Sequence, residues 1–120
     1  RRVLFRSSEM KYFWDQTTSL WLNGALHNKP ACIFTSSGSM HGGQESTLLT
    51  MLPPLFHHGM MILGLSNSIP ALSNTKTGGT PYGASHVSGP RHDQSLSQDE
   101  KILCEAQGKR LGEIVKKLHS

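Results

Sequence analysis

The chain has 120 residues, of which 36% are hydrophobic and 17% are charged. This length suits one modest domain, and this composition argues against a disordered chain. No apolar run approaches the roughly 20 residues that a membrane-spanning helix needs, and no signal-peptide pattern is present. We therefore expect a cytoplasmic globular protein without a membrane span.

The formal net charge of +4 is unevenly distributed along the chain. Three arginines and no acidic residue lie within Arg1–Ser7, and the rest of the chain has nearly balanced charges. Because that remainder shows no basic stripe with interleaved aromatic residues, the sequence argues against nucleic-acid binding. Arg1–Ser7 also lacks a helix cap, turn chemistry and periodicity. We interpret residues 1–7 as a non-native or artefactual segment and 8–120 as part of a folded domain.

The first half of the chain predicts two helices and a strand between them. Apolar residues at helical spacing predict a helix over Met10–Leu22. The nearly continuous apolar run Pro30–Thr35 is typical of a strand that is buried on both faces in a parallel sheet. A second helix is predicted over Gln44–His58, with a kink or restart at Pro53 because proline removes a hydrogen-bond donor. Gly59 is suited to a left-handed cap at its end.

The second half predicts one strand, a long loop and a clear helix. Met60–Leu65 reads as a second buried strand, and Ser66–Leu96 as a long polar loop of the kind that is usually functional or disordered. Ser97 and Glu100 form a capping-box pattern at the start of the last helix.

Four small residues support this organisation. Gly108 and Gly112 are expected to let the last helix approach a sheet closely. Cys32 and Cys104 form no CxxC pair, so we expect reduced core thiols, which also fits a cytoplasmic protein.

The pattern is that of an α/β protein with a right-handed crossover. Two predicted strands are too few to cover three helices, so apolar faces would remain exposed. The chain therefore reads as the back half of a doubly wound domain.

The most informative segment is Phe34–Glu45, which reads FTSSGSMHGGQE. A buried strand, then hydroxyls and glycines, then a helix start is how α/β proteins build a ligand-binding edge. The alternative is an ordinary polar connection between a strand and a helix, because such loops are rich in these residue types.

Four motifs in order carry a resemblance to a known family. They are DQTTSLWLNGAL (Asp15–Leu26), FTSSGSMHGGQE, FHHGM (Phe56–Met60) and GGTPYGA (Gly78–Ala84). From about Ser8 to the C-terminus the chain resembles the WrbA family, the flavodoxin-like type IV NAD(P)H:quinone oxidoreductases.

The resemblance implies the C-terminal half of a flavodoxin-like, doubly wound parallel sheet. It implies FMN as cofactor, NAD(P)H as co-substrate, a quinone substrate and a homotetramer. The implied reaction is hydride transfer from NAD(P)H to FMN and then two-electron reduction of the quinone, which is associated with protection against oxidative stress.

The same resemblance implies roles for single residues. The residues that match the loop around the edge of the flavin ring are Ser36, Ser37, Gly38, Ser39, Met40, His41 and Gly42. His57 matches a flavin-contacting histidine, although a simple helix-capping role is the alternative. Trp21 matches the aromatic wall of the substrate pocket, where stacking is worth about 0.5–1.5 kcal/mol, and a core aromatic is the alternative. We interpret His58 as structural, and Tyr82 either closes the pocket or packs its turn.

The family's loop for the FMN phosphate has no counterpart here, so we expect this chain alone to bind FMN weakly or not at all. Two other functions stay open. The chain is either part of a complete quinone reductase or a non-catalytic fragment that acts at most through oligomer contacts. A metal site built on its histidines is less favoured, because no His-x₃-His pair or cysteine partner is present.

Overall fold

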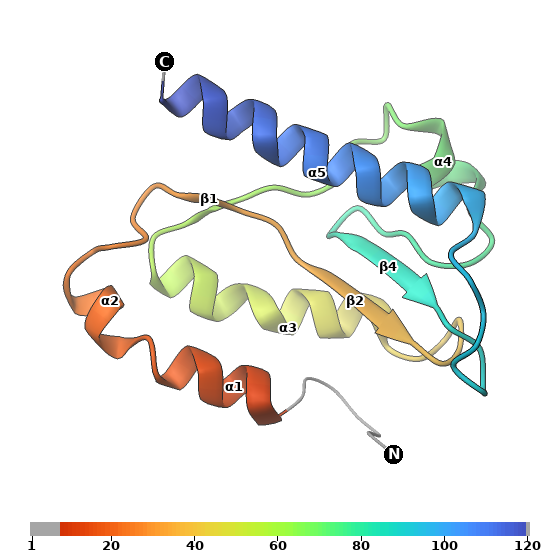
Figure 1. Cartoon of the computed structure of the whole chain (residues 1–120), viewed down its shortest axis with the longest axis horizontal. Coiled ribbons are helices and arrows are strands. Elements are labelled where there is room, and N and C mark those ends of the chain that lie inside the picture. The colour runs from red at the N-terminus through yellow and green to blue at the C-terminus, as the bar shows by residue number, and fades with distance from the viewer. Residues whose placement is uncertain (1–7, 120) are drawn as a thin grey trace.

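The computed structural model of the protein describes residues 8–119 (Figure 1). The interpretation of Arg1–Ser7 as artefactual lies outside them. The helices are α1 (Ser8–Asp15), α2 (Thr18–Leu22), α3 (Gln44–His57), α4 (Pro70–Asn74) and α5 (Gln98–Leu118). The strands are β1 (Pro30–Ala31), β2 (Phe34–Ser37), β3 (Met61–Ile62) and β4 (Ala84–Val87).

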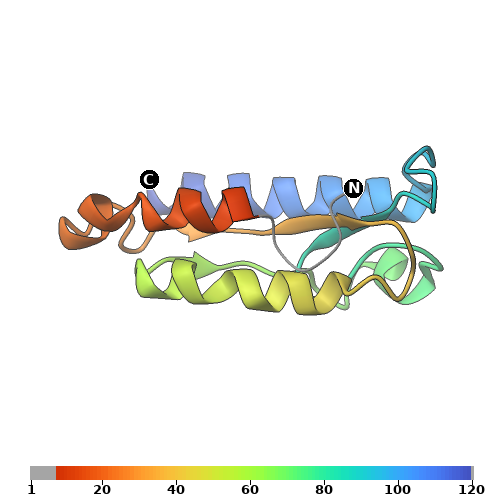
Figure 2. The ribbon, with the colours of Figure 1, turned by 90° about the horizontal axis from the view of Figure 1, so that it is seen from below.

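All strand pairs within the described residues are parallel. β1 pairs with β3, in the register Pro30 to Met61, and β2 pairs with β4, in the register Phe34 to Ala84. In the side view α5 covers one face of these strands and α3 covers the other (Figure 2). The predicted α/β class with parallel strands is confirmed, and the arrangement is consistent with part of a flavodoxin-like sheet.

The core consists of two small clusters of buried apolar residues. The first is Ile33, Leu48 and Leu55, and the second is Leu65, Ala71 and Leu103. Phe34 lies on β2 but is 76% exposed, so the prediction that its whole segment is buried on both faces is wrong. A small sheet leaves such a face uncovered.

The predicted first helix is divided in two. α1 ends at Asp15, and the hydroxyl of Thr17 donates a hydrogen bond to the carbonyl of Trp14 (2.6 Å). Such side-chain bonds compete with the helical pattern, and α2 then begins at Thr18. The strands are also shorter than the apolar runs that predicted them.

The helix around Pro53 and Pro54 is continuous as α3, so of the two expected outcomes, a kink or a restart, the restart is absent. Leu48 and Leu55, on either side of the prolines, are buried in the same cluster, and this packing holds the helix across them. Gly59 has φ of +72°, which confirms the left-handed cap.

The segment predicted as one long loop contains α4 and β4. The sequence did not predict β4, because a strand is recognised by apolar alternation and Ser85 and His86 are polar. Cys104 is exposed rather than in the core. A side chain at Gly108 or Gly112 would meet nothing within 4 Å, so the close approach expected there is wrong.

Among residues 8–119, no helix is long and apolar enough to cross a membrane.

Candidate cofactor and substrate site

The predicted cofactor loop, residues 36–42, connects the end of β2 with the start of α3. The ends of β2 and β4 lie side by side at this edge (Figure 1). The N–H of Ser88 donates to the carbonyl of Ser37 (2.8 Å), which ties the loop to the segment after β4. Within the loop, the N–H of Gly42 and the hydroxyl of Ser37 both donate to the carbonyl of Ser39, at 3.0 and 2.8 Å. The loop is therefore held at both ends.

The backbone donors at the centre of this loop are free. No acceptor within residues 8–119 bonds the N–H groups of Gly38, Ser39, Met40 and His41. The following helix α3 has Gly43 as N-cap, which offers no side-chain cap to its first N–H groups. Consecutive free N–H groups before a helix N-terminus favour carbonyl oxygens or anions as ligands.

Gly42 is required by the shape of the loop. A Cβ atom there would lie 2.8 Å from Cβ of Ser37 and 2.9 Å from the carbonyl oxygen of Ser39. Gln44, at the start of α3, stabilises the loop, because its side-chain amide donates a hydrogen bond to the carbonyl of Met40 (3.2 Å). The residues present fit the carbonyl-bearing edge of a flavin ring, since that edge needs several fixed donors.

A buried carboxylate supports the neighbouring strand β4. Glu100 is 1% exposed, and its carboxylate accepts hydrogen bonds from the N–H groups of Gly78 and Val87. It also accepts from the N–H of Ser97 (2.8 Å) and lies 2.9 Å from Nδ1 of His86. Burial alone would raise the pKa of Glu100, but these bonds outweigh it and lower the pKa to about 2.

The capping box at the start of α5 is confirmed, because the N–H of Glu100 also donates to the hydroxyl of Ser97 (3.2 Å). The sequence indicated only this local role. It did not indicate that the same carboxylate reaches β4 and the Gly78 turn.

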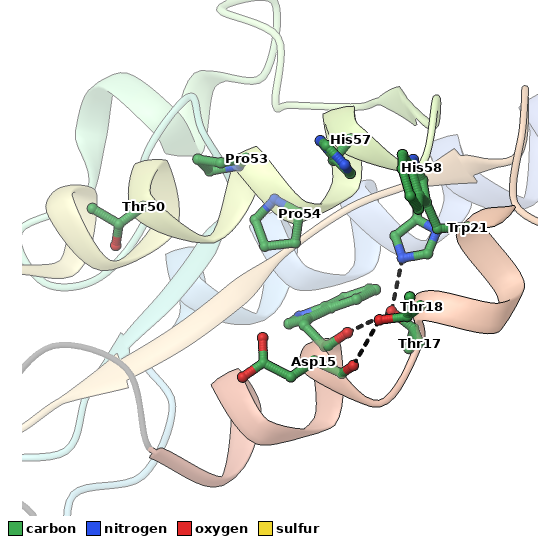
Figure 3. A pocket seen from close by; sticks show the side chains of 10 residues that line it. Asp15, Thr17, Thr18, Trp21, Thr50, Pro53, Pro54, His57 and His58 are labelled. Carbon is green, nitrogen blue, oxygen red and sulfur yellow. Dashed lines mark hydrogen bonds between the residues drawn. The ribbon is translucent and has the colours of Figure 1, made fainter.

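The other predicted site residues lie at the opposite end of α3. An open pocket of about 620 Å³ lies between α1, α2 and the end of α3 (Figure 3). It is lined by Trp14, Asp15, Thr17, Thr18, Trp21, Thr50, Pro53, Pro54, His57 and His58.

Trp21 and His57 are in direct contact in this pocket. Their ring centroids are 4.8 Å apart with an angle of 29° between the planes. Trp21 is 42% exposed, so the alternative of a core aromatic residue is wrong. A flat ligand can stack only on a face of the indole that His57 leaves free, because the two rings are already at stacking distance.

His58 is a buried residue of the pocket wall, in agreement with a structural role. Its Nε2 lies 2.8 Å from the hydroxyl oxygen of Thr17, which already donates its proton to the carbonyl of Trp14. His58 Nε2 must therefore be the donor in this contact. The contact joins the end of α3 to the α1–α2 turn (Figure 3).

The structure thus brings Trp21 and His57 together but does not bring either to the cofactor loop. The loop precedes Gln44 and His57 ends the same helix, so the length of the 14-residue α3 separates them. At a rise of 1.5 Å per residue this is about 20 Å. A three-ring flavin is too short to contact both groups in one chain.

One histidine near the loop had no predicted role. His92 lies beside Gly38, where a Cβ atom would be 3.2 Å from its Cε1. Nothing in the sequence around His92 signals this contact, because it depends on the turn that follows β4.

Tyr82 is 39% exposed in the Gly78–Ala84 turn. No group of histidine, cysteine and acidic side chains within the described residues could hold a metal ion.

No family model matches the chain. It is 41% identical over 114 residues to a protein named NAD(P)H dehydrogenase (quinone) from Chromohalobacter salexigens, covering 93% of this chain and 57% of that protein. A protein of the same name from Rhizobium rhizogenes has the same identity and coverage. Another from Syntrophobacter fumaroxidans is 43% identical, over 93% of this chain and 56% of its own length.

The chain therefore spans little more than half the length of these curated relatives. The predicted resemblance is confirmed in part, because these relatives are named NAD(P)H dehydrogenase (quinone), and neither the WrbA type nor FMN is part of their names.

Proposed function

We propose that this chain is the C-terminal part of an FMN-dependent NAD(P)H:quinone oxidoreductase of the WrbA type. The observation that carries the proposal is the row of free N–H groups from Gly38 to His41, directly before the uncapped start of α3. The names of relatives at 41–43% identity support the reaction class.

The loop residues Ser36–Gly42 would hold the edge of the flavin ring. Backbone N–H groups from Gly38 to His41 donate to ring carbonyl oxygens, and the hydroxyls of Ser36 and Ser39 add adjustable donors. Gly42 lets the backbone turn closely enough to present these groups. Bound FMN would supply the two-electron chemistry that the side chains of this loop lack.

The pocket beside α3 would take the flat substrate rings. Trp21 offers an exposed aromatic face for a quinone or a nicotinamide, and His57 orients that face by stacking on its other side. Among the ten lining residues there is one carboxylate, Asp15, and no lysine or arginine, so the pocket suits an uncharged ring rather than a phosphate. The overall reaction consumes NAD(P)H, a proton and a quinone and yields NAD(P)⁺ and a hydroquinone.

Assembly would unite the two halves of the site. The loop and the Trp21–His57 pair lie at opposite ends of α3, so they cannot flank the same ring within one chain. We propose a homotetramer in which Trp21 and His57 serve the flavin site of a neighbouring subunit. The proposed setting is cytoplasmic, with protection against oxidative stress as the role.

The competing function is a non-catalytic fragment that acts at most through oligomer contacts. The uncovered face at Phe34, which is 76% exposed, favours this alternative for the isolated chain. The two proposals differ in what they require of the loop, because a fragment acting by contacts alone needs no flavin donors.

The test is a steady-state assay of the whole protein with NADH or NADPH and benzoquinone, with and without added FMN. We expect quinone reduction that depends on FMN and on one of the two donors. The isolated 120-residue chain is the control, and we expect it to be inactive because it spans little more than half the length of its relatives. A rate of quinone reduction by the whole protein that is no higher than the background rate with the isolated chain, both at saturating FMN, would contradict the proposed function.

A further inference from the structure

His92 packs against Gly38 of the cofactor loop, and the proposed function gives this histidine no role. It sits in the turn after β4, where its N–H donates to the carbonyl of Gly89 (3.0 Å) and the N–H of Gln94 donates to the carbonyl of Ser88 (3.0 Å). Its φ is +58°, which is uncommon for a residue other than glycine. The imidazole packs against Gly38, where a Cβ atom would lie 3.2 Å from Cε1 and 3.9 Å from Nδ1.

The hydrogen bonds around Ser88 fix the protonation of this ring. The Ser88 hydroxyl lies 3.1 Å from the carbonyl oxygen of Ser37 and 2.9 Å from Nδ1 of His92. A carbonyl oxygen can only accept, so the single hydroxyl proton of Ser88 is directed to Ser37. Nδ1 of His92 must then donate to Ser88, and in the neutral ring Nε2 carries the lone pair.

Nε2 of His92 is consequently a free acceptor next to a row of free donors. It has no hydrogen-bond partner within residues 8–119, and His92 is exposed. Nε2 is bonded to Cε1, which is the atom of the ring nearest to Gly38. Gln44 also has an unpartnered acceptor oxygen near this loop, but that oxygen is shielded from solvent and out of reach of a ligand.

We propose that Nε2 of His92 accepts a hydrogen bond from the ring N–H of a flavin held by the loop. The inference rests on the proposed function, because it assumes that the ligand is a flavin. The pyrimidine edge of a flavin presents a carbonyl, an N–H and a second carbonyl in succession. The free backbone donors from Gly38 to His41 satisfy the carbonyl oxygens, and His92 supplies the acceptor that the N–H between them needs. Ser88 is then a positioning residue that holds His92 in the accepting tautomer.

The test uses two ring probes that carry no phosphate group, lumiflavin and N3-methyllumiflavin, titrated into the flavin-free form of the whole protein. The methylated probe cannot donate from N3. We expect His92→Asn to weaken lumiflavin binding by about three- to tenfold, as expected for one neutral hydrogen bond, and to leave N3-methyllumiflavin binding unchanged. Asparagine is the matched variant because it tolerates a positive φ and its amide can still reach Ser88.

Two further measurements separate a direct contact from a structural role. Nitrogen-15 NMR of the neutral His92 ring should show protonated Nδ1 and unprotonated Nε2. Addition of lumiflavin should shift the Nε2 resonance, and Ser88→Ala should let both tautomers appear.

The opposite results would overturn the inference. Equal losses of both probes in His92→Asn, or a ring protonated at Nε2, would show that His92 only shapes the turn. A lumiflavin affinity that is unchanged in His92→Asn would rule out this contact and leave the proposed function standing. Failure of lumiflavin to bind the whole protein at all would overturn the proposed function.

Discussion

The indole of Trp21 and the imidazole of His57 stack with their centroids 4.8 Å apart, although the two residues come from different helices. The contact joins α2 to the end of α3 and leaves Trp21 42% exposed at an open pocket. An exposed tryptophan whose orientation is fixed by a second ring is suited to bind a flat substrate.

Replacement of Trp21 by alanine should weaken substrate use without releasing FMN. In the whole protein we expect KM for the quinone and for NAD(P)H to rise by about two- to tenfold, the value of one aromatic stacking contact. The flavin should stay bound, because the proposed donors to its ring edge are the free N–H groups from Gly38 to His41 and not the indole of Trp21. Steady-state kinetics and the flavin absorbance of the purified variant measure the two effects.

Trp21→Phe is the matched control and should retain most of the affinity, since it keeps an aromatic face. Unchanged KM values for both substrates in Trp21→Ala would remove this residue from the site.

Gly42→Ala should damage the cofactor loop, because its new methyl group would lie 2.8 Å from Cβ of Ser37. We expect flavin affinity to fall by at least about tenfold, since several donors of the loop would be displaced together. Gly108→Ala is the matched control, because a methyl group there meets nothing within 4 Å. That change should stabilise α5 by about 0.5–1 kcal/mol and leave flavin binding alone. Flavin titration and thermal unfolding of both variants decide this prediction, and normal flavin affinity in Gly42→Ala would contradict it.

Glu100 should make the chain sensitive to acid. Its pKa is lowered from 4.5 to about 2 in the folded protein, so its contribution is complete above pH 4.5 and is lost as the pH falls toward 2. The shift corresponds to about 3 kcal/mol. Glu100→Gln should lower the free energy of unfolding at neutral pH by a similar amount and flatten its decline between these pH values.

Urea unfolding at a series of pH values measures this effect. Glu105→Gln, on the exposed side of the same helix, is the control and should change little. An acid profile for Glu100→Gln that is identical to that of the unmodified chain would show that the carboxylate contributes no pH-dependent stability.

Thr17→Val should destabilise the α1–α2 turn. The variant removes the acceptor of the His58 Nε2 proton, which is 2.8 Å from the Thr17 hydroxyl in a buried contact. An unsatisfied buried donor costs about 1–3 kcal/mol. The exposed Thr18 offers the control, because its hydroxyl bonds only to the carbonyl of Asp15. Thermal unfolding should show a larger loss for Thr17→Val than for Thr18→Val, and equal losses would refute the assigned role of Thr17.

Local sequence rules predicted those parts of the fold that depend on local contacts. The capping box at Ser97, the helix after Gly43 and the left-handed cap at Gly59 all depend on residues within one turn. The same rules failed at β4, which is polar in sequence and buried by its pairing with β2 and by α5. At Pro53 they allowed a kink or a restart, and the restart is absent, because packing of Leu48 and Leu55 holds the helix together on both sides of the prolines.

The site could be predicted only in its local part. The sequence placed the glycine- and serine-rich loop correctly between a strand and a helix, because spacing alone fixes that position. It could not reveal that Trp21 and His57 contact one another, or that both lie a full helix away from the loop. The Glu100 and His92 contacts were also hidden, since each joins segments that are brought together only by the folded chain.

The proposed role of the loop from Ser36 to Gly42 is to hold a flavin in the whole protein. The most direct measurement is the absorbance spectrum of that protein after purification and FMN loading, followed by anaerobic addition of NAD(P)H and then of a quinone. We predict a yellow protein with stoichiometric FMN whose colour is lost on addition of NAD(P)H and returns on addition of the quinone. A protein that stays colourless in excess FMN, or whose bound FMN does not respond to NAD(P)H, would contradict the claim.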